Sequence, residues 1–215
     1  MMLKAAANHS AKDRRESDRF TLDELGLAEK ALARFEAYLA LLLKWNARIN
    51  LTATREPEEI LRRHFAESIF AAGQTPEKTK TLLDYGSGAG FPGIPIAICR
   101  PEIGVTLAES QGKKAAFLRE AVRTLGLKAE VWADRVEAMP VDRVFDAVTL
   151  RAVDKMAAAC RTAAERLAPQ GWIAVFATRK TEVTLEKIAG IRWGEAVEIP
   201  GSDQEVLKTG ERDSR

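Results

Sequence analysis

A glycine-rich turn is the part of this sequence whose residue types imply chemistry most directly. It occupies residues 84–95, reads Asp-Tyr-Gly-Ser-Gly-Ala-Gly-Phe-Pro-Gly-Ile-Pro, and lies between an apolar run and an expected helix. Glycine lacks a Cβ and tolerates positive φ, so such a turn lets main-chain N–H groups approach a nucleotide-like cofactor closely. The cofactor contacts expected from it are those of Gly86, Ser87, Gly88, Gly90 and Phe91.

The spacing of the glycines distinguishes between classes of cofactor. A dinucleotide-binding turn of the form G-x-G-x-x-G would place its third glycine at position 91, where this chain has Phe91. The pattern is instead D-x-G-x-G-x-G, which is typical of sites for nucleotide-like methyl donors. It favours a methyltransferase, and an NAD-dependent oxidoreductase stays as the alternative.

Polar residues also follow the second and third expected strands. Glu109 ends the second strand about twenty residues after the turn, where a carboxylate can accept hydrogen bonds from ribose hydroxyls. Arg135, Val136 and Glu137 follow the third strand, where backbone groups and an apolar side chain could hold an adenine ring. The alternatives are a solvated acid at Glu109 and an ordinary loop after the third strand.

Two further residues could position a reacting group. Arg151 directly follows the fourth expected strand, and its guanidinium could hold a carboxylate or phosphate in bidentate fashion. His64 lies beside an apolar helix face, where a histidine is more often structural than catalytic, and Arg63 beside it could contact a phosphate. An exposed arginine at the strand end is the alternative for Arg151.

Several further polar and basic residues could contact nucleic acid phosphates. A cluster of cations is most often a solvated face, but cations at the rim of a parallel sheet can follow a phosphate backbone. The net charge of +2 permits an RNA partner without requiring one. The candidates are Asn50, Arg63, Lys113, Arg119, Arg179 and Lys180.

The elements that must position these residues alternate between short apolar strands and helices. Such alternation predicts a mostly parallel, seven-stranded α/β sheet with helices on both faces, in which ligands bind beyond the carboxyl ends of the strands. The expected strands are 81–85, 105–109, 129–133, 145–150, 172–177, 196–199 and 205–209, the last two forming a hairpin. The expected helices are 22–49, 57–70, 92–99, 112–125, 154–167 and 181–189.

The domain organisation follows from the same patterns. Residues 1–19 are polar and aperiodic and predict a mobile leader, residues 20–72 a helical extension, and residues 79–215 the core. No apolar run is long enough to span a membrane, and no metal-ligand spacing is found. We therefore expect a cytoplasmic monomer without a metal and without a membrane partner.

The sequence resembles the RsmG (GidB) family in segments that follow one another from about residue 35 to about residue 152. The segments that carry the likeness are Trp45-Asn46, Asn50-Leu51-Thr52, Arg63-His64 with Ser68, the turn 84–95, Arg100-Pro101-Glu102, residues 113–118, Arg135-Val136-Glu137 and Arg151-Ala152. The resemblance implies a Rossmann-like class I methyltransferase that uses S-adenosyl-L-methionine to methylate N7 of one guanosine in 16S ribosomal RNA. It implies cofactor contacts at Gly86, Phe91, Glu109, Val136, Glu137 and Arg151.

This chain departs from the family's pattern at a few positions. Glu109 and Glu67 stand where aspartate is usual, and Arg179-Lys180 stands where a Lys-Gly pair is usual. Guanine N7 carries a lone pair and no proton, so the implied reaction needs no general base. The substrate could be naked RNA or an assembled small subunit. The alternatives are a methyltransferase acting on another RNA, a protein or a small molecule, and a non-catalytic RNA-binding assembly factor.

Overall fold

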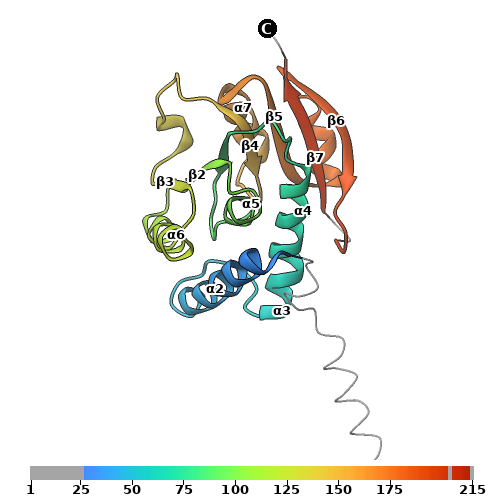
Figure 1. The fold of residues 1–215 in the computed structure, drawn as a ribbon. Coiled ribbons are helices and arrows are strands. Elements are labelled where there is room, and N and C mark those ends of the chain that lie inside the picture. Colours follow the sequence, from blue (N-terminus) through green and yellow to red (C-terminus); the bar gives the residue numbers. More distant parts are fainter. Residues whose placement is uncertain (1–26, 203–204, 214–215) are drawn as a thin grey trace, which may run out of the picture.

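A seven-stranded, mostly parallel sheet with helices on both faces forms the core of the protein (Figure 1). The structure, a computed structural model, describes residues 27–202 and 205–213. The strands are β1 Thr81–Tyr85, β2 Gly104–Ala108, β3 Ala129–Trp132, β4 Phe145–Leu150, β5 Leu167–Thr178, β6 Ile191–Glu198 and β7 Glu205–Arg212. Their order is β3-β2-β1-β4-β5-β7-β6, and only the pairings of β7 are antiparallel. The predicted fold class is confirmed.

The central strands are apolar because helices cover both of their faces. From Leu82 to Tyr85, and from Ala147 to Leu150, every residue is buried, as expected for parallel strands enclosed between two helical layers. Strands β1, β2, β3 and β4 run in the same direction, so their carboxyl ends meet at one edge of the sheet. This edge is where the predicted site residues should gather.

The helices divide into two layers with separate apolar cores. The described helices are α2 Glu29–Asn46, α3 Pro57–Glu59, η2 Ile60–Ala66, α4 Glu67–Gln74, α5 Gly93–Cys99, α6 Gly112–Leu125, η3 Val136–Ala138, α7 Met156–Glu165 and α8 Arg179–Leu185. The first core joins α2, η2, α4, α5 and α6 to one face of the sheet. The second joins α7 and α8 to the other face.

The N-terminal helices pack onto the core through an aromatic cluster. Phe35 and Tyr38 of α2 lie against Phe65 of η2, with ring centroids 5.3 and 5.2 Å from its centroid. Phe91 of the glycine-rich turn joins the cluster, 5.6 Å from Phe65. Figure 1 shows α2 crossing the end of the layer formed by α5 and α6, with α4 rising beside them. The extension thus contacts the turn that was predicted to bind cofactor.

The element bounds differ from prediction mainly in the extension and in the C-terminal strands. Helix α2 is shorter than the predicted 22–49, and the predicted helix 57–70 continues to Gln74 with a π-helical segment at 60–66. Strands β5 and β6 begin five residues earlier than predicted. The leader 1–19 and the first residues of the extension lie outside the described residues, so the proposed domain bounds stay predictions.

Both early strand starts contain an irregularity that resembled a loop in the sequence. In β5 the register with β4 shifts between Phe145 and Ala147, and Gln170 has a φ of 58°. In β6 the register with β7 shifts between Trp193 and Ala196. Proline and glycine at these irregularities gave the sequence the appearance of a turn.

Candidate active site

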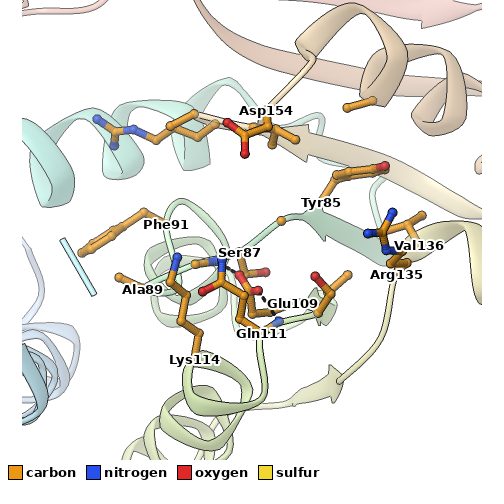
Figure 2. A pocket seen from close by; sticks show the side chains of 18 of the residues that line it. Tyr85, Ser87, Ala89, Phe91, Glu109, Gln111, Lys114, Arg135, Val136 and Asp154 are labelled. Carbon is orange, nitrogen blue, oxygen red and sulfur yellow. Dashed lines mark hydrogen bonds between the residues drawn. The ribbon is translucent and has the colours of Figure 1, made fainter. Parts of the chain in front are cut away.

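A cleft of about 780 Å³ lies at the carboxyl ends of the parallel strands. Ligand pockets commonly measure roughly 300–1,000 Å³, so the cleft is large enough for a nucleotide-sized ligand. Its lining comes from the glycine-rich turn, from the segments that follow β2, β3 and β4, and from the N-terminal extension. Figure 2 shows Ser87 and Glu109 at its centre, Phe91 toward one end, and Arg135 with Val136 toward the other.

The glycine-rich turn adopts backbone conformations that only glycine takes up readily. Gly86, Gly88 and Gly90 have φ values of 71°, 57° and 97°. A Cβ on Gly90 would also lie 2.4 Å from Cδ1 of Ile94 and 2.9 Å from the hydroxyl oxygen of Tyr38. Gly86 and Gly88 therefore present main chain without a side chain to the cleft, beside the side chains of Ser87, Ala89 and Phe91.

Asp84 fixes the start and the end of this turn from inside the protein. Its buried carboxylate accepts hydrogen bonds from the Thr149 hydroxyl at 2.9 Å and from the Gly93 N–H at 3.2 Å. Burial raises its pKa to about 6, although these hydrogen bonds oppose the rise. Asp84 thus connects β1 to β4 and to the first residue of α5.

Glu109 stands beside the turn and is held by two main-chain donors. One oxygen accepts from the N–H of Gly88 at 3.0 Å and the other from the N–H of Gln111 at 2.7 Å, as the dashed lines in Figure 2 show. Only 7% of the residue is exposed. A carboxylate has about four lone-pair sites, so two hydrogen bonds leave capacity for ligand hydroxyls.

The segment after β3 forms one end of the cleft. Val136 is buried at the start of the η3 turn, while Arg135 is exposed. The carboxylate of Glu137 accepts a hydrogen bond from the Tyr85 hydroxyl at 2.9 Å. Burial, followed by the contact with Glu137, raises the pKa of Tyr85 to about 12. This end of the cleft therefore offers an aromatic ligand ring three kinds of group: the apolar side chain of Val136, main-chain groups and the neutral hydroxyl of Tyr85.

Arg151 is engaged by protein groups, whereas we expected it to hold a ligand anion. Its Nη2 donates to the carboxylate of Glu67, to that of Glu205 at 3.4 Å and to the carbonyl of Arg63 at 2.9 Å. The guanidinium also lies over the ring of Phe176, 4.8 Å from its centroid. Its Nη1 is buried and has no partner within residues 27–202 and 205–213. Arg151 thus joins β4, the extension and β7 while lining the cleft.

His64 lines the cleft from the π-helical segment. Its ring stacks on Phe91 with centroids 5.0 Å apart and planes inclined by 24°. Burial lowers its pKa to about 3, and the charges of Arg151 and Arg63 lower it further. The imidazole is therefore neutral near pH 7, and its Nδ1 is buried without a partner in the part of the chain that the structure describes.

The structure does not bring the RNA candidates into the cleft. None of the six is among the residues that line it, and all six are exposed. Arg63 pairs with Glu59 at 3.3 Å, and Arg179 pairs with Glu198 at 2.5 Å. Asn50 accepts a hydrogen bond from Arg55 at 3.0 Å. The cations that do line the cleft are Lys114, Arg135, Arg151 and Lys155.

Sequence reasoning missed residues that hold the extension in place. The Tyr38 hydroxyl donates to the carbonyl of Ala89 at 2.6 Å, which ties α2 to the glycine-rich turn. Asn46 is buried, accepts from the N–H groups of Leu51 and Thr52, and donates to the Thr52 hydroxyl. Tyr38 falls on the apolar face of its helix and carried no separate signal. Asn46 was visible only as part of the family motif.

The described residues contain neither a cluster of metal-binding side chains nor a helix that could span a membrane. Within residues 27–202 and 205–213, no group of three or more His, Cys, Asp or Glu side chains could hold a metal ion. Among the helices of that same part of the chain, none is long and apolar enough to cross a membrane.

Comparison with known sequences gives one consistent family. A family model described as rRNA small subunit methyltransferase G (GidB) matches residues 31–191. A protein of Xanthomonas campestris pv. campestris (strain 8004) named Ribosomal RNA small subunit methyltransferase G is 42% identical over 172 residues, which cover 78% of this chain and 80% of that protein. A protein of the same name from Roseiflexus sp. (strain RS-1) is 38% identical over 196 residues, covering 85% and 84%.

Comparison with solved structures returns chains of similar fold, several of which are named as methyltransferases. The cofactor-bound Rv0187 from MTB has a TM-score of 0.61 at 18% identity, covering 85% of this chain and 90% of that one. The T. thermophilus 16S rRNA methyltransferase RsmC, in complex with AdoMet and guanosine, has a TM-score of 0.56 at 20% identity, covering 69% and 43%. At these identities the likeness shows the fold.

Proposed function

The chain belongs to the rRNA small subunit methyltransferase G (GidB) family, and on that basis we propose that it methylates N7 of one guanosine in 16S ribosomal RNA. It is an S-adenosyl-L-methionine-dependent methyltransferase of ribosomal RNA. The observation that carries the proposal is the arrangement of one cleft with two walls. Strand ends form one wall, and the N-terminal extension with Arg151 forms the other. A cofactor and an acceptor base can therefore meet between the two.

The residues of the first wall fit a nucleoside-like cofactor. The main chain of Gly86 and Gly88 lines the cleft without a side chain, and Glu109 retains lone pairs for ribose hydroxyls. We assign the adenine to Val136 and its neighbours Arg135 and Glu137, with Phe91 at the opposite end of the cleft (Figure 2). When bound, S-adenosyl-L-methionine supplies a methyl group on a positively charged sulfonium.

The reaction requires the protein to position the two reactants rather than to transfer a proton. Guanine N7 has a free lone pair, so no base is needed to activate it. The cleft agrees with this, because His64 is neutral with a pKa of about 3 and Asp84 is enclosed by its own hydrogen bonds. Holding both reactants in an attack geometry can contribute roughly 7–11 kcal/mol to the rate.

Two carboxylates balance the charge of Arg151, which lines the cleft in which a free cation would oppose the reaction. Positive charge moves onto the purine during methyl transfer, so an unpaired guanidinium beside N7 would raise the barrier. Glu67 and Glu205 pair with Arg151, and these carboxylates offset its charge. We propose that Arg151 positions the extension against the core, and that its contact with the cofactor is secondary.

The RNA must present the target base outside a regular helix. N7 lies in the deep, narrow major groove of A-form RNA, which side chains hardly enter, so the guanosine must be in a loop or flipped out. We propose that the exposed cations Arg63, Lys113, Arg119, Arg179 and Lys180 contact the phosphates around it, with Asn50 beside them. We further propose that a monomer acts on the small subunit in the cytoplasm.

A transfer assay with three acceptors tests the function. The protein is incubated with methyl-labelled S-adenosyl-L-methionine and with small subunits, naked 16S RNA, or a panel of small molecules and proteins. We expect label in the ribosomal RNA, as 7-methylguanosine. Label on the small molecules or proteins with none on RNA would overturn the proposal.

A binding measurement separates the cofactor classes. Calorimetry should show binding of S-adenosylhomocysteine and no binding of NADH. Tight NADH binding without S-adenosylhomocysteine binding would contradict both the cofactor and the enzyme class. Loss of methylation in a Gly86→Asp variant, without loss of folding, would exclude a purely structural role in subunit assembly.

A further inference from the structure

The imidazole of His64 is held in one orientation at the wall of the cleft that faces the acceptor. It stacks on Phe91, which is itself packed 5.4 Å from Tyr38 and 5.6 Å from Phe65, measured between ring centroids. Phe91 is 6% exposed, so it serves as a fixed platform. The ring of His64 therefore presents one edge to the protein and the other to the cleft.

The environment of the two ring nitrogens determines which of them carries the proton. Nδ1 is buried and has no partner among the described residues, whereas Nε2 is neither hydrogen-bonded nor buried. The positive charge of Arg151 lowers the pKa of the imidazole, and a guanidinium has only donors to offer. Orphaned N–H groups are rarer than orphaned acceptors, so the lone pair belongs on Nδ1. The accessible Nε2 is then an N–H donor.

A neutral donor at this position matches one atom of guanine in particular. On the edge that carries N7, guanine presents the acceptor O6, whereas adenine presents an amino group that donates. A donor beside the reacting nitrogen therefore favours guanine and leaves an adenine with two donors facing each other. Because the ring is neutral, it supplies this hydrogen bond without adding positive charge near N7.

We propose that the Nε2–H of His64 donates a hydrogen bond to O6 of the acceptor purine and so selects guanine over adenine. This inference rests on the proposed function and adds a specificity-determining residue to it. His64 thereby selects the base, while the wall formed by the strand ends, here called the cofactor wall, selects the methyl donor. A hydrogen bond of this kind contributes about 0.5–1.5 kcal/mol, equivalent to about a 2- to 12-fold change in rate.

A double-mutant cycle between residue 64 and atom O6 tests the proposal. The RNA substrate carries either guanine or 2-aminopurine at the target, because 2-aminopurine keeps N7 and the 2-amino group and lacks O6. It also lacks the proton on N1, and the cycle separates this second change because it affects both forms of the enzyme alike. The enzyme carries either His64 or His64→Phe, which keeps a ring stacked on Phe91 and lacks the donor. The measured quantity is kcat/KM for RNA at saturating S-adenosyl-L-methionine.

The cycle has a clear expected result. His64→Phe should lower the rate on guanine RNA about 2- to 12-fold and leave the rate on 2-aminopurine RNA unchanged. His64→Gln, which keeps a neutral N–H donor, should recover part of the preference for guanine. Equal losses on both substrates would overturn the proposal, because the missing donor would then act without reference to O6.

The controls keep a failure of this inference distinct from a failure of the proposed function. Unchanged S-adenosylhomocysteine binding by His64→Phe shows that the variant is folded. If that variant does not fold, the cycle is run with His64→Leu, which also lacks the donor, and a ratio of guanine to 2-aminopurine rates equal to that of the wild type overturns the proposal. A wild type that methylates no guanine at all contradicts the proposed function itself.

Discussion

The two walls of the cleft are built by different kinds of interaction. The cofactor wall, formed by the strand ends, is held by hydrogen bonds to main chain and to buried carboxylates, across 9 residues between Asp84 and Gly93 and 65 between Asp84 and Thr149. The acceptor wall, formed by the N-terminal extension with Arg151, depends on this arginine, which reaches Arg63 and Glu67 across 88 and 84 residues. Main-chain geometry and hydrogen bonds therefore define the cofactor site, and ion pairs between distant elements assemble the site for the base.

The difference teaches where specificity can change in this fold. A wall made of main chain and one carboxylate tolerates few substitutions, because glycine conformations and a buried aspartate restrict it. The acceptor wall is built from side chains of an added helical layer, whose helices carry no such glycine conformations. The cofactor wall thus suits a shared methyl donor, and the acceptor wall suits a particular substrate.

Replacing Arg151 should have the largest effect on stability, because the substitution breaks the ion pairs that hold the acceptor wall. Arg151→Met leaves Glu67 and Glu205 without their cation, and Glu67 is 4% exposed at its side chain. Breaking such a buried pair costs roughly 3–5 kcal/mol of unfolding free energy, to be measured by urea denaturation.

The matched control is Arg192→Met, whose ion pair with Glu211 is 73% and 44% exposed at the two side chains. This variant should lose about 1 kcal/mol or less. Equal losses in the two variants would show that Arg151 is not a long-range connection on which the acceptor wall depends.

The pH dependence of the unfolding free energy should depend on Asp84, a buried residue of the cofactor wall. Its folded pKa of about 6 is raised from 3.8, so the folded state holds a proton that the unfolded state has lost between these values. The contribution to stability is therefore present below pH 3.8 and is lost as the pH rises toward 6, by about 3 kcal/mol in all.

Asp84→Asn removes this titration. Compared with the variant, the wild type should lose unfolding free energy between pH 4 and pH 6.5, as measured by denaturant titration across that range. A constant difference between the two proteins would mean that Asp84 is not buried in the way described.

Weakening Glu109 should impair the cofactor wall alone. Glu109→Gln places an amide NH₂ against one of the main-chain N–H donors, and hydrogen bonds to charged groups are worth about 1.5–3 kcal/mol. S-adenosylhomocysteine should bind about 10- to 150-fold more weakly in calorimetry. Glu195→Gln, an exposed carboxylate remote in sequence from the turn, should bind it as the wild type does.

Single rim cations should have the smallest effect, confined to RNA. Replacing Arg63 or Lys113 by Gln should reduce the slope of RNA affinity against salt by about 1 and leave S-adenosylhomocysteine binding unchanged. Fluorescence titration at several salt concentrations measures this slope. An unchanged slope in both variants would remove these residues from the RNA-binding surface, and Lys187→Gln serves as the exposed control.

The parts that the sequence predicted well are those encoded locally. Strands β1 and β4 and helix α6 have the predicted bounds, because their apolar periodicity and turn residues act within a short window. The glycine-rich turn, Glu109 and Val136 were predicted to converge, and Gly86, Ser87, Gly88, Phe91, Glu109 and Val136 line the cleft, whereas Gly90 does not. Topology alone brings them together, since each follows a parallel strand.

The remaining parts depend on contacts that no local pattern specifies. The carboxylates that engage Arg151 come from α4 and β7, so an expected ligand contact became an internal ion-pair network. Tyr38 resembled any apolar-face residue of a helix until its hydroxyl met Ala89. The π-helical segment that carries His64 has no distinct residue pattern, because it continues an ordinary helix.

The central claim is that the two walls bring a methyl donor to N7 of guanine in the small subunit. Nucleoside mass spectrometry of small-subunit RNA tests it most directly, on cells with the protein, without it, and with Glu109→Gln. We expect 7-methylguanosine to be present with the protein, absent without it, and reduced in the variant. An unchanged amount of 7-methylguanosine in cells that lack the protein would contradict the account.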